Sequence, residues 1–239
     1  MAYKVLIFDG RGICRDSIDG LSRDLRFYLY PNYWIGSVGQ TQLRSAEWAH
    51  TCACLALPHC SDVGVYKRLG QDAEAIKQIC DFVQNGGSFL AIGGGAFFAS
   101  AQANWNGRTI WTTPLALWPG TSDRLCLSGG AHVHDLNVNI DGSECHCYLF
   151  WKDGGEFMAG TSMSVLARYN DNESVAGIHY VSGKGNVVLW HAHLEYTLTA
   201  KVFWDSGMQF SPDKIKVTRS LPINSFNTES CIARRTTPP

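Results

Sequence analysis

The stretch Ser88–Ser100 reads SFLAIGGGAFFAS, and it decides the fold. A short apolar strand, Phe89–Ile92, runs into three glycines, and the letters AFF that follow begin a helix. A buried strand that enters a helix through a tight turn is the pattern of a nucleophile elbow in α/β enzymes. Glycines suit such a turn because its apex is strained and its neighbours leave no room for a Cβ. The apex here is Gly93, so the expected elbow carries no nucleophilic side chain.

Composition limits the classes of protein and partner. The 239 residues suffice for one large α/β domain or two small ones, with a buried core. The formal net charge of −1 gives no electrostatic footprint for nucleic acid or an anionic membrane surface. No stretch approaches the ~20 apolar residues of a membrane span. The nine scattered cysteines favour a reduced, cytoplasmic protein over a disulfide scaffold.

The first hundred residues alternate between apolar strands and helical segments, which indicates a parallel sheet with helices on its faces. Ser17 is a candidate cap for the first helix, and the spacing of apolar residues predicts a helix over Gly70–Asn85. The expected strands of this half are Lys4–Asp9, Tyr33–Val38, Cys52–Leu57 and the elbow strand.

Beyond the elbow the pattern changes to short strands joined by Gly, Asn and Asp turns, which are typical of β-hairpins. They are Val133–Ile140, Glu144–Phe150, Phe157–Ala159, Val165–Tyr169, Val175–Val181 and Asn186–Trp190. We therefore predict an α/β fold: a doubly wound, mostly parallel sheet with β-hairpin insertions. The domain is expected to cover residues 1–207, with a closing helix around Thr197–Trp204, and residues 208–239 to form a polar tail.

A second informative stretch is Gly185–Tyr196, GNVVLWHAHLEY, in which a strand ends in a loop that holds His193 and Glu195. A carboxylate two residues from a histidine can orient the imidazole and fix its tautomer. Residues just beyond the carboxyl ends of parallel strands line the ligand crevice of an open sheet. We therefore expect this loop to face the elbow at Gly93.

The order of these motifs resembles the class I glutamine amidotransferase-like superfamily, which has a flavodoxin-like fold, and more narrowly the N-terminal domain of fungal biotin–protein ligases. The residues that carry the resemblance are VLIFDGRG (Val5–Gly12), LPHCSD (Leu57–Asp62), GGSFLAIGGGAFF (Gly86–Phe98), WPGTS (Trp118–Ser122), FWKDGGEF (Phe150–Phe157) and Gly185–Tyr196. The resemblance extends over most of residues 4–204. Its specificity comes from the order and spacing of the motifs together.

The resemblance implies a site without its nucleophile. Gly93 stands at the place of the family's catalytic cysteine, so glutamine hydrolysis through a thioester is not expected. His193 and Glu195 stand at the places of the catalytic histidine and its acidic partner. An acid–base pair of this kind can still move a proton without a nucleophile.

The oxyanion-hole positions implied by the resemblance are Gly94 and the segment after Pro58. Where such proteins often carry two glycines after this proline, the chain has His59 and Cys60, which add bulk and a thiol. Cys60 is either a relocated nucleophile or a small buried thiol.

Three more residues are candidates for binding. Phe97 and Trp151 belong to an aromatic group around the elbow that is either core or the wall of an apolar pocket over Gly93. Arg11, in the loop after the first strand, is either an anion anchor or an exposed arginine.

Three classes of function stay open. The first is a cofactor-free enzyme on a small molecule (an isomerase, lyase, cyclase or non-covalent hydrolase, for example in fungal secondary metabolism) that uses His193 and Glu195. The second is a non-catalytic binding or regulatory domain like that of the biotin–protein ligases. The third is a metalloprotein built on the pairs His132/His134 and His191/His193, with Cys145-His146-Cys147 nearby. We expect the first, with a small-molecule substrate, no cofactor, no metal and a possible homodimer. Only the second requires the pair to be buried against protein atoms with no cavity beside Gly93.

Overall fold

The computed structural model describes residues 3–60, 62, 64–124, 132–140, 143–151, 154–158 and 162–196, and for 132–135, 139–140, 143–148 and 150–151 it describes the backbone alone. The predicted helix at 197–204, the domain boundary at 207 and the polar tail lie outside the described residues. Within that part of the chain, no helix is long and apolar enough to cross a membrane.

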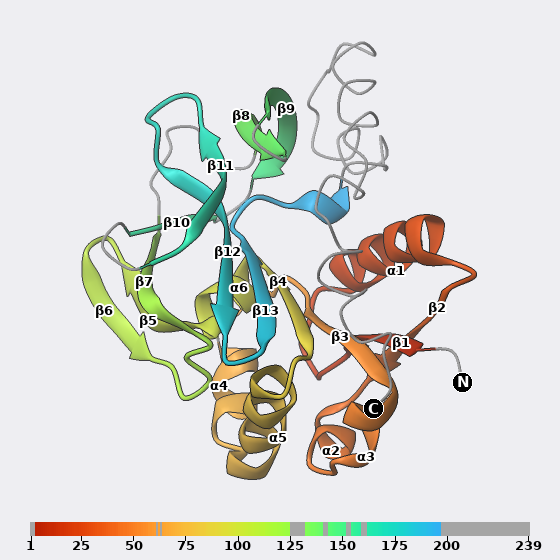
Figure 1. Cartoon of the computed structure of the whole chain (residues 1–239). Coiled ribbons are helices and arrows are strands. Elements are labelled where there is room, and N and C mark those ends of the chain that lie inside the picture. Colours follow the sequence, from red (N-terminus) through yellow and green to blue (C-terminus); the bar gives the residue numbers. More distant parts are fainter. Residues whose placement is uncertain are drawn as a thin grey trace.

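Five parallel strands form the centre of the sheet, in the order β2-β1-β3-β4-β13 (Figure 1). They are β1 (Tyr3–Phe8), β2 (Tyr33–Val38), β3 (Cys52–Leu57), β4 (Ser88–Ile92) and β13 (Gly185–Trp190). Every residue of β3 is buried, as expected of a parallel strand that is covered on both faces. The predicted doubly wound sheet is therefore present, and β4 lies between β3 and β13.

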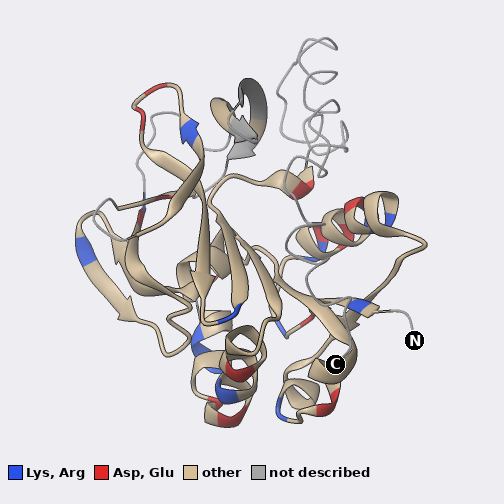
Figure 2. Cartoon of the chain, viewed as in Figure 1, with Lys and Arg blue, Asp and Glu red and all other residues tan. Residues whose placement is uncertain are grey.

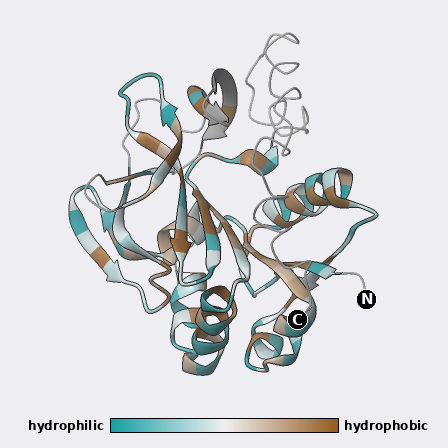
Figure 3. Ribbon diagram, viewed as in Figure 1, coloured by the Kyte–Doolittle hydropathy of each residue, from teal (hydrophilic) through white to brown (hydrophobic). Residues whose placement is uncertain are grey.

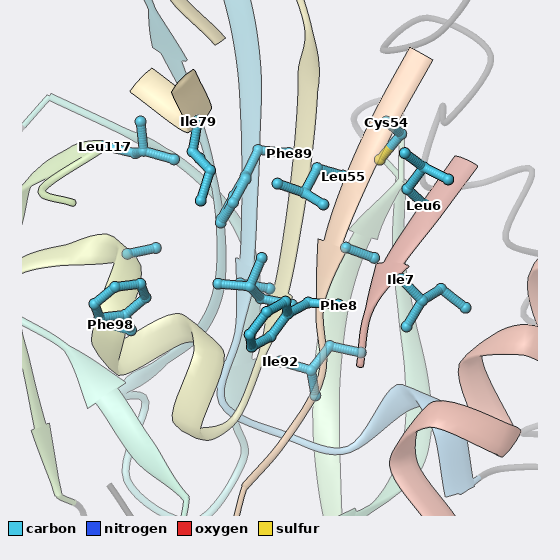
Figure 4. Close-up of a cluster of buried hydrophobic side chains, with 14 of the residues drawn as sticks. Leu6, Ile7, Phe8, Cys54, Leu55, Ile79, Phe89, Ile92, Phe98 and Leu117 are labelled. Carbon is cyan, nitrogen blue, oxygen red and sulfur yellow. The ribbon is translucent and has the colours of Figure 1, made fainter. Parts of the chain in front are cut away.

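Several helices pack against this sheet, among them α1 on β1 and β2, and α5 on β13. The helices are α1 (Arg15–Leu29), α2 (Gln40–Leu43), α3 (Glu47–Thr51), α4 (Gly64–Gly70), α5 (Ala73–Gln84), α6 (Gly94–Ala99) and the short 3-10 helix η1 (Leu194–Tyr196). Figure 2 marks charged residues along α1 and α5, and Figure 3 marks hydrophobic residues on the same two helices. Phe8, Leu55, Phe89 and Phe98 belong to the core cluster, which Figure 4 shows in close-up.

The helix predicted over Gly70–Asn85 is shorter than expected. α4 ends at Gly70, and α5 begins at Ala73 after the N-cap Asp72, whose carboxylate accepts a hydrogen bond from the backbone N–H of Ala75. Aspartate at an N-cap satisfies one of the unpaired N–H groups of a first helical turn.

Beyond β13 the sheet continues as β12-β10-β7-β5-β6, and these neighbours are antiparallel except for the parallel pair β5 and β7. The strands are β5 (Ser100–Trp105), β6 (Arg108–Thr112), β7 (Trp118–Arg124), β10 (Gly155–Phe157) and β12 (Val175–Ser182). β11 (Ser164–Tyr169) pairs with β12 and with β8 (His132–Ile140), which pairs with β9 (Ser143–Trp151). The predicted hairpin insertions are present, but β5, β6 and β7 were not predicted.

Candidate functional site

The elbow has the strained backbone that its sequence predicts. Gly93 adopts φ 53° and ψ −115°, in a region that favours glycine. Its backbone N–H donates to the carbonyl of Trp190 at the end of β13, with N and O 2.7 Å apart. Because β4 lies between β3 and β13, the loops that follow those two strands meet at Gly93.

These loops bring two histidines together. The rings of His59 and His193 lie edge to face, with centroids 4.5 Å apart and an interplanar angle of 85°. The Nδ1 atom of His193 is 3.0 Å from Oε1 of Glu195. The histidine and carboxylate therefore have the mutual geometry expected of an acid–base pair, and they lie at the elbow.

The space above Gly93 is filled by His59. A Cβ built on Gly93 would lie 2.5 Å from Nδ1 and 3.2 Å from Cγ of His59, and 3.4 Å from Cε1 of His193. A Cβ on Gly94 would lie 2.6 Å from the Sγ of Cys60. The expectation that the missing side chain opens a pocket at Gly93 is therefore wrong, because the side chains of the next loop occupy that space.

Ser17 connects the parts of the site, and its role was not predicted. Its hydroxyl donates to Oε1 of Glu195 at 2.7 Å and accepts from the backbone N–H of His59 at 2.9 Å. Ser17 is the third residue of α1, and the N-cap is Cys14, so the expectation that Ser17 caps the helix is wrong. A serine early in a helix gives no local signal for contacts with residues 42 and 178 positions away.

The site is closed to solvent. The side chains of His193 and Glu195 are 0% exposed, and the residue His59 is 6% exposed. The backbone of Glu195 is fixed as well: its carbonyl accepts a hydrogen bond from Arg23 at 3.2 Å and lies so close to Gly20 that a Cβ there would be 2.4 Å away. In this arrangement a solute has no direct contact with the imidazole of His193.

Cys60 has the properties of a structural thiol. Burial raises its pKa to about 12, and the carboxylate of Asp62 contributes to the rise. At neutral pH the thiol is therefore protonated, and the thiolate is the nucleophilic form. The burial of Cys60, whose residue is 5% exposed, thus favours the buried-thiol interpretation over a relocated nucleophile.

Three predicted residues remain, and each has its own surroundings. Arg11 is exposed, and its carbonyl accepts a hydrogen bond from the guanidinium of Arg68 at 2.9 Å. Phe97 is buried with its ring 4.6 Å from that of His191. Trp151 ends β9, and its side chain lies outside the described residues.

The histidine pair at the end of β13 does not converge on one point. The Nε2 atom of His191 is 3.0 Å from the hydroxyl of Ser122, whereas His193 contacts Glu195. Burial lowers the pKa of His191 to about 3, which keeps its ring neutral at physiological pH. Among the residues that the structure describes, no three His, Cys, Asp or Glu side chains are grouped to hold a metal. The side chains of His132, His134 and 145–147 lie outside that description.

Solved structures with this fold include glutamine amidotransferases. One is 16% identical, with a TM-score of 0.59 over 84% of this chain and 95% of its own. Another, from Thermotoga maritima, is 12% identical, with a TM-score of 0.56 over 97% of this chain and 94% of its own. The fold is therefore that of the class I glutamine amidotransferases, as the order of the motifs predicted.

Sequence comparison gives a narrower family. The family described as "Biotin-protein ligase, N terminal" matches residues 3–221, and the chain belongs to it. A biotin–protein ligase from Schizosaccharomyces pombe is 28% identical over 212 residues. That similarity covers 81% of this chain and 33% of the ligase, so the chain spans about a third of the length of that relative.

Proposed function

We propose that this chain is a non-catalytic domain that binds and regulates a biotin–protein ligase. The observation that supports this most is the ring of His59 above Gly93, where a catalytic side chain would stand: a Cβ there would be 2.5 Å from Nδ1. Membership of the ligase N-terminal family supports the choice of partner.

In this proposal the residues at the family's catalytic positions have a structural role. Ser17, His59, His193 and Glu195 connect α1 to the loops after β3 and β13 through buried contacts. A buried polar group that loses its partner costs about 1–3 kcal/mol. The network therefore stabilises this edge of the sheet without any turnover.

The rival proposal is a cofactor-free enzyme in which His193 and Glu195 transfer a proton on a small molecule. It requires His59 to leave its place, since His193 is fully buried. Replacement of His193 separates the two proposals, because the enzyme would lose turnover whereas the structural network would lose stability.

The experiment compares the wild-type chain with His193→Ala. Each protein is incubated with glutamine, to measure ammonia, and with a fungal metabolite extract, to follow consumption by mass spectrometry. We expect no difference in either assay and a lower free energy of unfolding for the variant in urea. Consumption of any compound that depends on His193 would contradict the non-catalytic proposal.

The proposed regulation of a biotin–protein ligase is tested in a separate experiment. The chain is added to the fission yeast ligase from which the matching third has been removed, and biotin transfer is measured. We expect the chain to change the rate of biotin transfer by the truncated ligase. The intact ligase, which retains its own domain, serves as the control, and its rate is expected to stay the same. Equal rates with and without the chain would contradict a role with the ligase.

A further inference from the structure

A groove lined with aromatic side chains lies between α1 and β2, two elements that pack side by side (Figure 1). We call it the α1–β2 groove; it measures about 910 Å³, and Phe27, Tyr30 and Trp34 are among its lining residues. These three residues are 74%, 75% and 56% exposed, respectively. Contiguous apolar surface of this kind marks a place where another molecule binds.

β2 forms one wall of this groove and ends the sheet. In the described part of the chain, β2 pairs with β1 alone. A terminal strand with exposed aromatic residues invites association with other chains, and proteins commonly cover such edges. A partner that covers the α1–β2 groove is therefore expected.

The exposed aromatic residues supply a substantial part of the area that a stable interface needs. Aromatic side chains bury ~150–250 Å² each, so at their present exposure the three residues of the groove can bury roughly 300–500 Å² together. In a standard protein–protein interface each partner buries about 800 Å². The other lining residues of α1 and β2 can supply the remainder. The groove is therefore large enough to form the core of a dimer interface.

The charges along the groove fit a second copy of the same chain. Asp19 and Arg26 both line the groove, and both are exposed. They lie two turns apart on one face of α1, or roughly 10 Å along the helix. Among the described residues, neither side chain has an ion pair. Each copy therefore offers one carboxylate and one guanidinium at opposite ends of the same surface.

A two-fold axis satisfies both charges at once. Most soluble homo-oligomers have closed symmetry, with two-fold dimers the commonest, and across a two-fold axis residue i contacts residue j while j contacts i. Two α1 helices that run antiparallel across such an axis place Asp19 of each copy beside the partner's Arg26. A purely apolar partner would instead cover these two charges without a counter-charge, which is unfavourable.

We infer that two copies of this chain associate through the α1–β2 groove across a two-fold axis. The aromatic residues of the two grooves pack on one another, and Asp19 of each copy pairs with the partner's Arg26. The inference does not depend on the proposed function, because it uses neither the site at Gly93 nor the ligase.

Analytical ultracentrifugation of the full-length chain over a range of concentrations tests whether this dimer forms. We expect a concentration-dependent dimer, and we expect Phe27→Ser to raise its dissociation constant at least about a hundredfold, because an aromatic residue is lost from both sides of the interface. The matched control is Val181→Ser: Val181 is 56% exposed in β12 and does not line the groove, so the constant is expected to stay the same. A monomeric wild-type chain would overturn the inference, whatever else covers the groove, as would equal constants for the two variants.

Charge reversal tests the two-fold arrangement. In a dimer of Asp19→Arg, or of Arg26→Asp, like charges meet at both paired positions, so each variant alone is expected to dissociate on the order of tenfold more readily than the wild type. An equimolar mixture is expected to regain the wild-type affinity, because one copy then carries two arginines and the other two aspartates at these positions. Circular dichroism verifies that both variants are folded before they are mixed. A mixture that associates no more tightly than the separate variants would overturn the inference.

Discussion

Restoring a side chain at the elbow is predicted to destabilise the protein through a clash with His59. In Gly93→Ala, the new Cβ would lie 2.5 Å from Nδ1 of His59, closer than real Cβ contacts, and the residue would keep φ near 53°. Strained backbone of this kind costs of order 1–3 kcal/mol. Overpacking costs typically about 1–3 kcal/mol more. We therefore expect a total loss of about 2–6 kcal/mol, against a usual stability of about 5–15 kcal/mol.

A double-mutant cycle separates the clash from the strain. In the His59→Ala background the ring is gone, so Gly93→Ala is expected to cost only the backbone strain, which leaves a coupling of about 1–3 kcal/mol between the two sites. Urea unfolding followed by tryptophan fluorescence measures all four proteins. If Gly93→Ala costs the same in both backgrounds, His59 does not fill the space above Gly93, and the reasoning is refuted.

Three further predictions concern single residues. The pKa of His191 is held near 3, below its ordinary value, so the unfolded chain takes up a proton between pH 6.5 and 3 that the folded protein does not. Stability should fall as the pH is lowered: relative to His191→Gln, the wild type should lose about 2 kcal/mol between pH 6.5 and 5, and parallel urea curves would contradict this. Glu195→Ala should lower the free energy of unfolding by about 1–3 kcal/mol for each of the two hydrogen bonds that Oε1 of Glu195 forms with Ser17 and His193. Glu195→Gln keeps an acceptor oxygen and should lose less; equal losses would show that the acceptor is unimportant. The Cys60 thiol, whose pKa is near 12, should resist iodoacetamide at pH 8 in the folded protein and react in urea, as peptide mass spectrometry can show; rapid labelling of the folded protein would contradict its burial.

The sequence allowed the centre of the fold to be predicted because its signals are local. Each of these signals is contained within a few consecutive residues: an apolar strand, the glycines of the elbow, or the spacing of His193 and Glu195. The hairpin of β5 and β6 also had a local signal that was missed: Asn106-Gly107, both with positive φ, is the preferred pair for a tight β-turn.

The contents of the site could not be predicted in the same way. Ser17 and His59 reach Glu195 and Gly93 from distant parts of the chain, and no local pattern records which side chain fills a space left by a glycine. The sequence likewise did not indicate that Phe27, Tyr30 and Trp34 are exposed and line one groove. Such contacts depend on tertiary packing.

A high-resolution crystal structure of the full-length chain tests the central claim most directly, through the electron density of one side chain. The account predicts that the ring of His59 lies over Gly93, edge to face with His193, and that no solvent density separates them. A ring turned outward, with an open cavity between Gly93 and His193, would contradict it.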